Sequence, residues 1–234
     1  MFEAEARWIA KCLEHASNNL EDNANSVLNL GSSTRHYREI AQPYINKLIF
    51  EPMKERFSFT HADAKQGDGI DLSGDFCEPA FWEQINDRSY DVIICSNLLT
   101  HVFDRDIIIN NIKRLAKEKS YIVVTSPFIY PYCADPYDSK FRPDCQQLLG
   151  LFPELELLDA ATVSSGTGHV YRLLRNKRDL ASFLINVILP RKGMKRWRNV
   201  ASDVPNIFMH FQTSCVFLQS VSRTKAVSDF AAGR

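Results

Sequence analysis

The segment Asp91-Val-Ile-Ile-Cys-Ser-Asn-Leu-Leu-Thr-His-Val-Phe-Asp104 carries the clearest structural signal in the chain. Its apolar, β-branched beginning is typical of a strand that is buried on both faces. The polar residues Ser96 and Asn97 follow directly, and an apolar pair then leads to His101. A buried strand that runs into polar side chains predicts an open α/β sheet with a ligand site beyond the carboxyl ends of its strands.

A second segment, Val27-Leu-Asn-Leu-Gly-Ser-Ser-Thr34, has the same design. The residues Ser26–Gly31 predict a short buried strand that ends in a glycine turn. Gly31 allows the backbone to turn sharply and to approach a ligand closely, and Ser32 and Ser33 offer hydroxyls and amides where a helix begins. A glycine after a strand is equally often a plain turn. This segment therefore indicates a ligand site only in combination with the first segment.

The spacing of apolar residues in the rest of the chain predicts a Rossmann-like, doubly wound α/β fold. Amphipathic helices are expected at Glu3–Leu20 and Asp104–Lys119, and strand, helix and strand in this order predict right-handed parallel crossovers. We expect a mostly parallel sheet of seven strands in which the last strand runs antiparallel at the edge. Beyond the first strand, the strands are expected at Ser58–Ala62, Gly69–Leu72, Asp91–Cys95, Tyr121–Thr125, Leu155–Val163 and Phe211–Gln219.

Composition narrows the class of partner. The 28 basic and 28 acidic residues cancel, which removes the long-range attraction on which nucleic-acid binding depends. The apolar stretch Leu180–Leu189 is too short for a membrane span, and residues 1–7 do not resemble a signal peptide, so a cytoplasmic location is expected. The six cysteines are scattered without zinc-site spacing, and no metal is expected.

The chain is expected to form a single domain over residues 1–222, with a helical insertion at about 166–205 and a flexible tail at 223–234. Basic residues gather in the insertion between 172 and 198, around the apolar helix Leu180–Leu189. Three interpretations stay open for them: a lid for an anionic acceptor, peripheral contact with a membrane surface, and a solvated basic face.

Taken together, the two opening segments resemble the class I S-adenosylmethionine-dependent methyltransferase family. Val27–Thr34 is similar to its first cofactor loop. Tyr90–Val102 is similar to its fourth-strand motif, in which an aromatic-Asp pair opens the strand and Leu-x-His ends the following turn. Phe128–Asp144 is similar to the loop after the fifth strand in bacterial members, and the resemblance covers about residues 25–165. It implies methyl transfer from S-adenosylmethionine to an O or N of a small-molecule or saccharide-type acceptor, with S-adenosylhomocysteine as product.

The family holds the adenosyl ribose with a carboxylate at the end of the second strand, because two adjacent hydroxyls can donate to one carboxylate. Asp63 and Glu51 compete for this role. If Leu48–Phe50 were the second strand, the chain would supply one strand too many before Tyr121, so we interpret Pro43–Phe57 as mostly helical. Asp63 is therefore the preferred ligand, and Glu51 remains the alternative.

The resemblance implies further cofactor contacts. Asp75 would accept the adenine amino proton and Phe76 would pack on the base, while Asp71 would face the sheet edge or solvent. At the end of the first strand, Asn29 would offer a neutral amide toward the methionine amino group. The complete expected set is Asn29, Gly31, Ser32, Ser33, Asp63, Asp75, Phe76 and Asn97.

Methyl transfer is an in-line displacement in which the protein aligns the acceptor and, where needed, removes a proton. His101 is the candidate base, and the other residues expected to face the acceptor are Tyr130, Tyr132, Asp135 and Asp138. In the competing interpretations, His101 packs the turn and Tyr130 is a packing anchor. The other five histidines are expected to be structural or superficial, and Arg142 is expected to pair with Asp138 or Asp144.

Three residues depart from the family pattern. Asn29 replaces an acid, Thr100 replaces a frequent glutamate, and Cys133 stands where relatives often carry histidine. These departures motivate an alternative, a catalytically inactive relative that serves as a binding or scaffolding protein. That alternative predicts an occluded or empty cofactor cleft.

Overall fold

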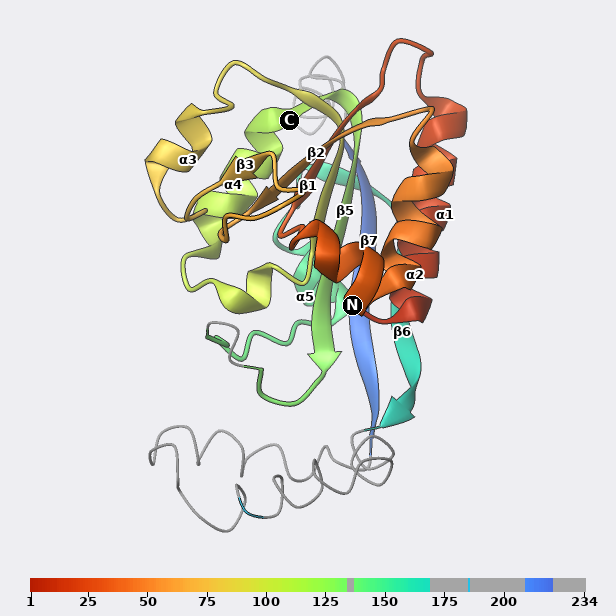
Figure 1. Cartoon of the computed structure of the whole chain (residues 1–234), viewed down its shortest axis with the longest axis vertical. Coiled ribbons are helices and arrows are strands. Elements are labelled where there is room, and N and C mark those ends of the chain that lie inside the picture. Colours follow the sequence, from red (N-terminus) through yellow and green to blue (C-terminus); the bar gives the residue numbers. More distant parts are fainter. Residues whose placement is uncertain (134–136, 169–184, 186–208, 221–234) are drawn as a thin grey trace, which may run out of the picture.

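The computed structural model describes residues 1–133, 137–168, 185 and 209–220 (Figure 1). A seven-stranded sheet runs through the centre in the order β3-β2-β1-β4-β5-β7-β6. The pairs among β3, β2, β1, β4 and β5 are parallel, and β7 is antiparallel to both of its neighbours. The strands are β1 Ser26–Leu30, β2 Ser58–Asp63, β3 Leu72–Ser73, β4 Tyr90–Ser96, β5 Ala116–Ile129, β6 Leu155–Gly168 and β7 His210–Ser220. The predicted Rossmann-like sheet is thus confirmed.

The last strand, β7, is antiparallel as predicted, but its predicted place at the edge is wrong, because it lies between β5 and the edge strand β6. Its central residues are buried, with Val216 opposite Val124 on β5 and opposite Ala160 on β6. Because β7 has a neighbour on each side, its backbone groups are paired along both edges.

The predicted strand at Gly69–Leu72 is shorter than expected, because only Leu72 and Ser73 pair with β2. Gly69 has a positive φ of 73°. Asp71 donates its N–H to the His61 carbonyl over 2.8 Å, and its carboxylate accepts the His61 N–H over 2.7 Å. The Asp71 side chain thus takes the place of a backbone carbonyl, and regular pairing begins only after it.

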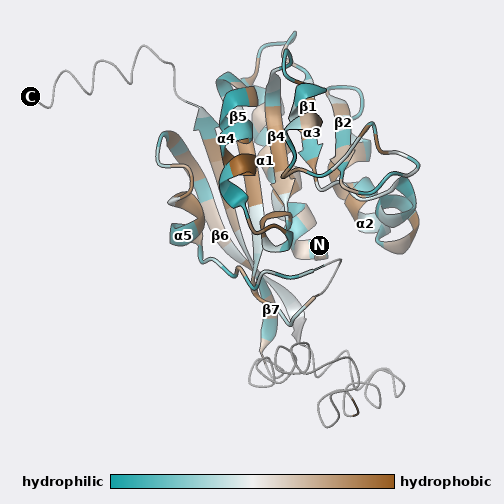
Figure 2. Ribbon diagram, turned by 90° about the vertical axis from the view of Figure 1, so that its left-hand side faces the viewer, coloured by the Kyte–Doolittle hydropathy of each residue, from teal (hydrophilic) through white to brown (hydrophobic). Residues whose placement is uncertain are grey.

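Helices cover both faces of the sheet (Figure 1). The N-terminal helix α1 packs on one face through a stripe that includes Ala6, Ile9, Leu13 and Ala16, which are all fully buried. The hydropathy colours show apolar central strands between helices with polar outer surfaces (Figure 2). The helices and helical turns are α1 Glu3–Asn19, η1 Tyr37–Ala41, α2 Pro43–Ile45, η2 Asn46–Phe50, η3 Glu51–Met53, α3 Pro79–Glu83, η4 Leu99–His101, α4 Arg105–Leu115 and α5 Cys145–Leu149.

The two faces of the sheet bury separate cores. One core joins α1, α2 and η2 to the sheet, and it includes Ile9, Ile49 and Phe57. The other joins α3, α4 and α5 to the opposite face, and it includes Phe81, Ile112 and Leu148. The helical structure over residues 37–53 confirms that this stretch is not the second strand.

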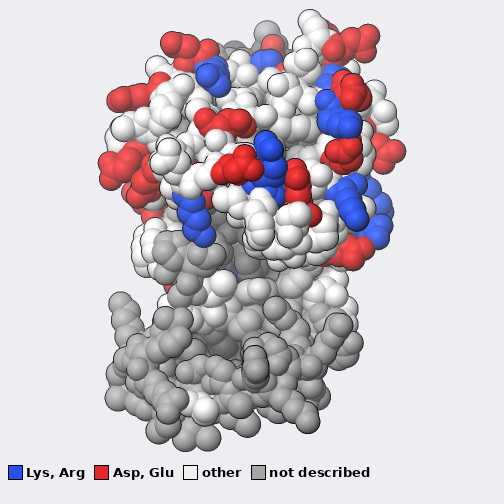
Figure 3. All heavy atoms as spheres, viewed as in Figure 1, with Lys and Arg blue, Asp and Glu red and all other residues white. Residues whose placement is uncertain are grey.

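Several expectations fall outside the described residues. These are nearly all of the insertion at about 166–205, its basic stretch at 172–198, the tail at 223–234 and Asp135. Within the described residues, no helix has the length and apolar character needed to cross a membrane, and no group of three metal-ligating side chains converges. On the described part of the face in Figure 3, acidic and basic side chains are interspersed.

Candidate active site

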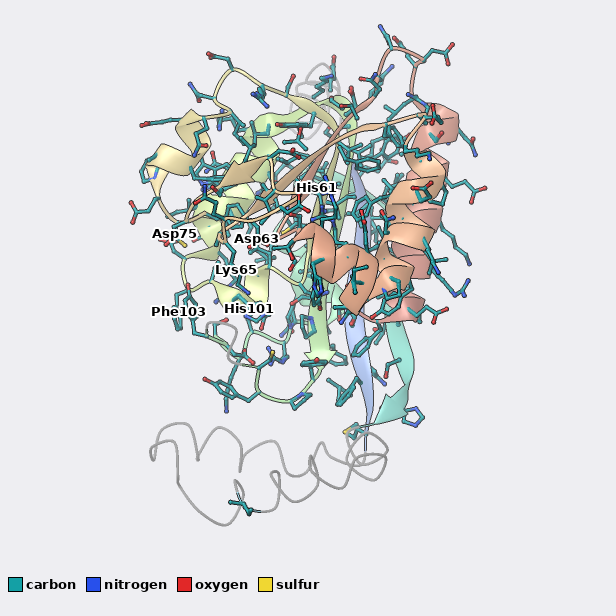
Figure 4. The ribbon with its side chains drawn as sticks, in the orientation of Figure 1. His61, Asp63, Lys65, Asp75, His101 and Phe103 are labelled. Carbon is teal, nitrogen blue, oxygen red and sulfur yellow. The ribbon has the colours of Figure 1, made fainter. Side chains whose placement is uncertain are left out.

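A cavity of about 500 Å³ opens where the carboxyl ends of β1, β2 and β4 meet. Its volume lies within the range that is usual for small-molecule sites. Figure 4 shows Asp63, Lys65 and His101 near one another at this end of the sheet. The topology brings all eight predicted cofactor residues onto the cavity wall, namely Asn29, Gly31, Ser32, Ser33, Asp63, Asp75, Phe76 and Asn97.

The loop after β1 is shaped for close approach to a ligand. Gly31 has a φ of 75°, and a Cβ placed on it would lie 3.3 Å from the Leu98 Cβ. The N–H groups of Gly31 and Ser32 both donate to the Ala62 carbonyl over 2.9 Å, which ties the loop to the end of β2. Ser33 also adopts a left-handed conformation, with a φ of 56°. The loop therefore needs a residue without a side chain at position 31.

Asp63 ends β2 with its carboxylate on the cavity wall. One carboxylate oxygen accepts the Ser33 N–H over 2.7 Å and the other accepts the Lys65 N–H over 2.9 Å. A carboxylate has about four acceptor sites, so each oxygen retains capacity for a hydroxyl donor. Asp63 thus meets the chemical requirement for gripping two ribose hydroxyls.

The alternative acid, Glu51, lies in η3 and is exposed. Its carboxylate forms an ion pair of 2.7 Å with Lys54, three residues further along the same turn. The residues that line the cavity include Phe50 and Asp63 but not Glu51. The geometry therefore favours Asp63 as the cofactor acid.

Asp75 and Phe76 both line the cavity, but the first is exposed and the second is buried. Asp75 is exposed and accepts the Cys77 N–H over 2.8 Å, which shapes the turn after β3. Phe76 is 2% exposed, and its ring packs edge-to-face against Phe81 with centroids 4.7 Å apart. Phe76 therefore belongs to the core as well as to the cavity wall, and it offers a rigid apolar surface there.

Asn29 lies next to His61, one of the histidines expected to be structural. The Asn29 Nδ2 is 3.1 Å from the Nδ1 of His61, its partner in register on β2. The His61 ring packs edge-to-face against Phe50 and stacks on Phe59. Burial, followed by the positive charge of Arg38, lowers the pKa of His61 to about 4. The neutral imidazole can thus accept from the Asn29 amide, whose carbonyl is left for other partners.

Arg38 is a cavity residue that sequence reasoning missed. It is 5% exposed, and its guanidinium donates to the carbonyls of Ser32, Ser33 and Gly69. Burial lowers the pKa of Arg38, and Glu39 and Asp71 partly oppose this effect. The guanidinium holds the loops after β1 and β2 together on the cavity wall. No local pattern set Arg38 apart, because it stands in the polar run Arg35-His-Tyr-Arg-Glu39.

His101 ends η4 and lines the same cavity. Its Nδ1 is 2.8 Å from the Tyr137 carbonyl oxygen. A carbonyl can only accept, so Nδ1 carries the proton and Nε2 of the neutral ring is the acceptor. The Tyr137 ring stacks on Phe103 with centroids 5.1 Å apart, and Phe103 is 70% exposed. His101 is thus oriented by its neighbour in the way that a base requires.

A smaller chamber of about 170 Å³ adjoins the first cavity. The two share Met1, Tyr37, Asn97 and His101 in their walls. Tyr130, predicted to face the acceptor, lines the smaller chamber, and its ring lies 5.1 Å from that of Phe211. Tyr130 is therefore both a wall residue and a packing anchor.

The loop after β5 contributes an ion pair to the smaller chamber. Arg142 pairs with Asp138 rather than Asp144, with 2.6 Å between the Arg142 Nη2 and the Asp138 Oδ2. The N–H groups of Cys133 and Lys140 also donate to Asp138, over 2.8 and 2.7 Å. Burial acts to raise the pKa of Asp138, but these hydrogen bonds and the Arg142 charge outweigh it and leave the pKa lowered.

Thr100, which replaces a frequent glutamate of the family, contacts both members of this ion pair. Thr100 is 2% exposed, donates to the Asp138 Oδ1 over 3.2 Å and accepts from Arg142. A glutamate in this position would add a second carboxylate beside Asp138. The hydroxyl instead bridges the two charged partners.

Glu5 is the second residue that sequence reasoning missed. It lies on α1, is fully buried and lines the smaller chamber. The signal was its spacing: Glu5 precedes Ile9 by one helical turn and therefore lies on the apolar stripe of α1. An amphipathic helix is expected to carry its charges on the opposite face, which holds for Glu3 but not for Glu5.

Known proteins resemble this chain in two ways. A family model described as a methyltransferase domain matches residues 58–178, slightly more than half of the chain. Comparison with curated proteins gave no match.

Solved structures share the fold at low sequence identity. A proposed sarcosine dimethylglycine methyltransferase from Galdieria sulphuraria is 17% identical, with a TM-score of 0.54 over 93% of this chain and 84% of that one. A SAM-dependent methyltransferase from Archaeoglobus fulgidus is 13% identical, with a TM-score of 0.47 over 92% of this chain and 94% of that one. Coclaurine N-methyltransferase bound to N-methylheliamine and SAH is 13% identical, with a TM-score of 0.48 over 91% and 72% of the two chains.

The sheet order and the family match define a class I S-adenosylmethionine-dependent methyltransferase. The chain belongs to the methyltransferase domain family, and S-adenosylmethionine is its methyl donor. The cavity at the strand ends is open rather than occluded.

Proposed function

We propose that this methyltransferase transfers the methyl group to an O or N of a small-molecule or saccharide-type acceptor, whose reacting end enters the smaller chamber. The observation that carries the proposal is the connection of two cavities through Met1, Tyr37, Asn97 and His101. The larger one has the volume for a cofactor, and the smaller one has room for only part of an acceptor.

The residues of the larger cavity suit S-adenosylmethionine. Asp63 would hold the ribose hydroxyls, Asp75 and Phe76 would meet the adenine, and Asn29 and Asn97 would meet the methionine end. When bound, the cofactor supplies an electrophilic methyl group on a sulfonium. The Gly31 turn admits a ligand close to the backbone, because a side chain there would meet Leu98.

The residues of the smaller chamber would position the acceptor and accept its proton. His101 presents Nε2 as a hydrogen-bond acceptor, since its Nδ1 donates to the Tyr137 carbonyl. Tyr130 forms part of the wall that orients the acceptor. Asp135 retains its proposed role on the acceptor side, although it lies outside the described residues.

Calorimetric titration with S-adenosylhomocysteine tests the cofactor site. We expect Asp63→Asn to weaken binding by at least about tenfold, because charge-assisted hydrogen bonds to the ribose are lost. Glu51→Gln removes the same charge from the exposed turn, and binding should stay within about twofold of wild type. The reverse ranking of the two variants would move the ribose ligand to Glu51. Absence of binding to the wild-type chain at millimolar ligand would remove the proposed function.

A further inference from the structure

Glu5 and Asn97 meet where the two cavities join. Asn97 lines both cavities, and Glu5 lines the smaller chamber from helix α1. The Asn97 Nδ2 donates to the Glu5 Oε1 over 2.7 Å. The same oxygen accepts the Thr125 hydroxyl over 2.7 Å, and the other carboxylate oxygen accepts the Phe2 N–H over 3.2 Å. Glu5 is fully buried, so these contacts hold its carboxylate in one place.

The contact with Glu5 decides which end of the Asn97 amide is available to a ligand. A carboxylate only accepts hydrogen bonds, so the amide must turn its NH2 group toward Glu5. In the part of the chain that the structure describes, the carbonyl oxygen of Asn97 receives no hydrogen bond. Asn97 therefore presents an acceptor at the junction of the cavities. The direction of the hydrogen bond fixes this orientation, whatever the net charge of the chamber.

The backbone of Asn97 is held as well as its side chain. Asn97 follows β4 with a φ of 56°, a left-handed conformation that asparagine tolerates better than most residues do. Its N–H donates to the Thr125 carbonyl over 2.9 Å. Because both parts of the residue are fixed by neighbouring groups of the protein, its carbonyl oxygen is preorganised to accept from a ligand.

We propose that Glu5 is a positioning residue for the cofactor. It holds the carbonyl oxygen of Asn97 toward the ammonium group at the methionine end of S-adenosylmethionine, and that ammonium group donates to the oxygen. This inference rests on the proposed function, in which Asn97 meets the methionine end, and it adds a residue of α1 that acts through Asn97. The competing explanation is a role in the fold alone, in which Glu5 only attaches α1 to the ends of β4 and β5.

Two ligands separate positioning from a role in the fold. S-adenosylhomocysteine carries the ammonium group, whereas methylthioadenosine has the same adenosyl sulfide without the amino-acid part. In calorimetric titrations of the whole chain at neutral pH, Glu5→Gln should weaken binding of S-adenosylhomocysteine by at least about fivefold and binding of methylthioadenosine by less than about twofold. The reason is that glutamine can also donate and no longer fixes the Asn97 amide. An equal loss for both ligands, or no loss for either, would overturn the inference.

A double-mutant cycle tests whether Glu5 acts through Asn97, and it needs only S-adenosylhomocysteine. Asn97→Gly removes the amide and suits the positive φ. In this background, Glu5→Gln should change the affinity by less than about twofold, because the group that it positions is already absent. A loss as large as in the wild-type background would mean that Glu5 acts independently of Asn97, and the inference would fail.

Glu3→Gln provides the matched control for the change of charge. It removes the same charge from an exposed site on the same helix, and the affinities for both ligands should match those of the wild type. A selective loss of S-adenosylhomocysteine binding in Glu3→Gln would contradict the inference, because the effect would then not depend on the contact with Asn97.

Hydrogen exchange of the wild-type chain adds a measurement that needs no variant. The Nδ2 protons of Asn97 should exchange with solvent at least about tenfold more slowly than those of exposed Asn110. Equal exchange rates would show that the Asn97 amide is not held, and they would exclude the inference even if Glu5→Gln does not fold.

Binding of S-adenosylhomocysteine to the wild-type chain is measured first and separates the inference from the function on which it rests. If the wild-type chain does not bind this ligand, the proposed function fails. If the wild-type chain and Glu5→Gln bind it equally well, only the positioning role of Glu5 fails.

Discussion

His61 illustrates how one residue can belong to the core and still influence the site. Its ring lies between Phe50 and Phe59, and it contacts the Asn29 amide on the cavity wall. A charged imidazole would lose this acceptor role and would be poorly solvated in its aromatic surroundings. The histidine that looked incidental in the sequence therefore sets the orientation of Asn29.

The lowered pKa of His61 predicts acid sensitivity. The ring has a pKa of about 4 in the folded protein and about 6.5 when unfolded. Because the unfolded state takes up the proton first, the stabilising contribution is fully present above pH 6.5 and is lost as the pH falls toward 4. The loss amounts to about 3 kcal/mol at most.

Urea unfolding at pH 7.5 and at pH 4.5 measures this effect. We expect His61→Phe to lose less stability than the wild type between the two pH values, whatever its stability at neutral pH. His36 is exposed, and His36→Gln should reproduce the wild-type pH dependence. An unchanged pH dependence in His61→Phe would contradict the prediction.

At the scale of elements, the β1 loop shows why local patterns were informative. A strand followed by a glycine and two serines places backbone N–H groups at the carboxyl end of the strand, and two of them donate to the Ala62 carbonyl. The strand at β3 is shorter than the sequence pattern predicted, because the Asp71 side chain replaces one backbone hydrogen-bond acceptor. Strand lengths therefore depend on side-chain contacts that periodicity does not reveal.

Two glycines with positive φ allow backbone strain and steric contact to be separated. Gly31→Ala should destabilise the fold by about 1–2 kcal/mol through its φ of 75°. It should also weaken S-adenosylhomocysteine binding by at least about tenfold, because the new methyl group pushes on Leu98 beside the ligand. The measurements are thermal unfolding and calorimetry.

Gly166 provides the matched control. Its φ is 69°, and a Cβ there meets no atom of the described part of the chain within 4 Å. Gly166→Ala should therefore cause a similar loss of stability but leave ligand affinity unchanged. If both variants bind the ligand normally, the β1 loop does not need close approach at position 31.

On the scale of the whole molecule, the residues of the candidate site and a stabilising ion pair lie at opposite ends of the sheet. The candidate site lies at the carboxyl ends of the parallel strands, whereas an ion pair lies near their amino ends. There Asp91 accepts from Lys117 over 2.9 Å and from the Ser26 hydroxyl over 2.6 Å. Burial opposes ionisation of Asp91, but the hydrogen bonds from Ser26 and Lys117 outweigh it, and the pKa of Asp91 is lowered.

Asp91→Asn should therefore destabilise the protein by about 1–3 kcal/mol, since Lys117 and Ser26 lose their charged partner. Affinity for S-adenosylhomocysteine should not change, because the substitution lies at the far end of β4. Asp68 forms an exposed pair with Arg35, and Asp68→Asn should cost less than about 0.5 kcal/mol. Weakened ligand binding in folded Asp91→Asn would show that the two ends of the sheet are coupled.

Local pattern was sufficient for the parallel strands, the glycine turn after β1 and the acid at the end of β2. These features depend on neighbouring residues and on the rule that parallel strands present their carboxyl ends together. The choice of Asp63 over Glu51 also followed from the sequence, since counting strands left no place for a strand at Leu48–Phe50.

Only the tertiary structure decided which side chains surround the smaller chamber. Glu5 meets Asn97 and Thr125, which lie 92 and 120 residues further along the chain. The Tyr137 carbonyl selects the tautomer of His101 from 36 residues away. Such contacts arise when helices and loops close over the sheet, and a short-range pattern holds no information about which side chains meet there. The sequence by itself therefore predicted residues that line the larger cavity, and folding determined which side chains meet in the smaller chamber.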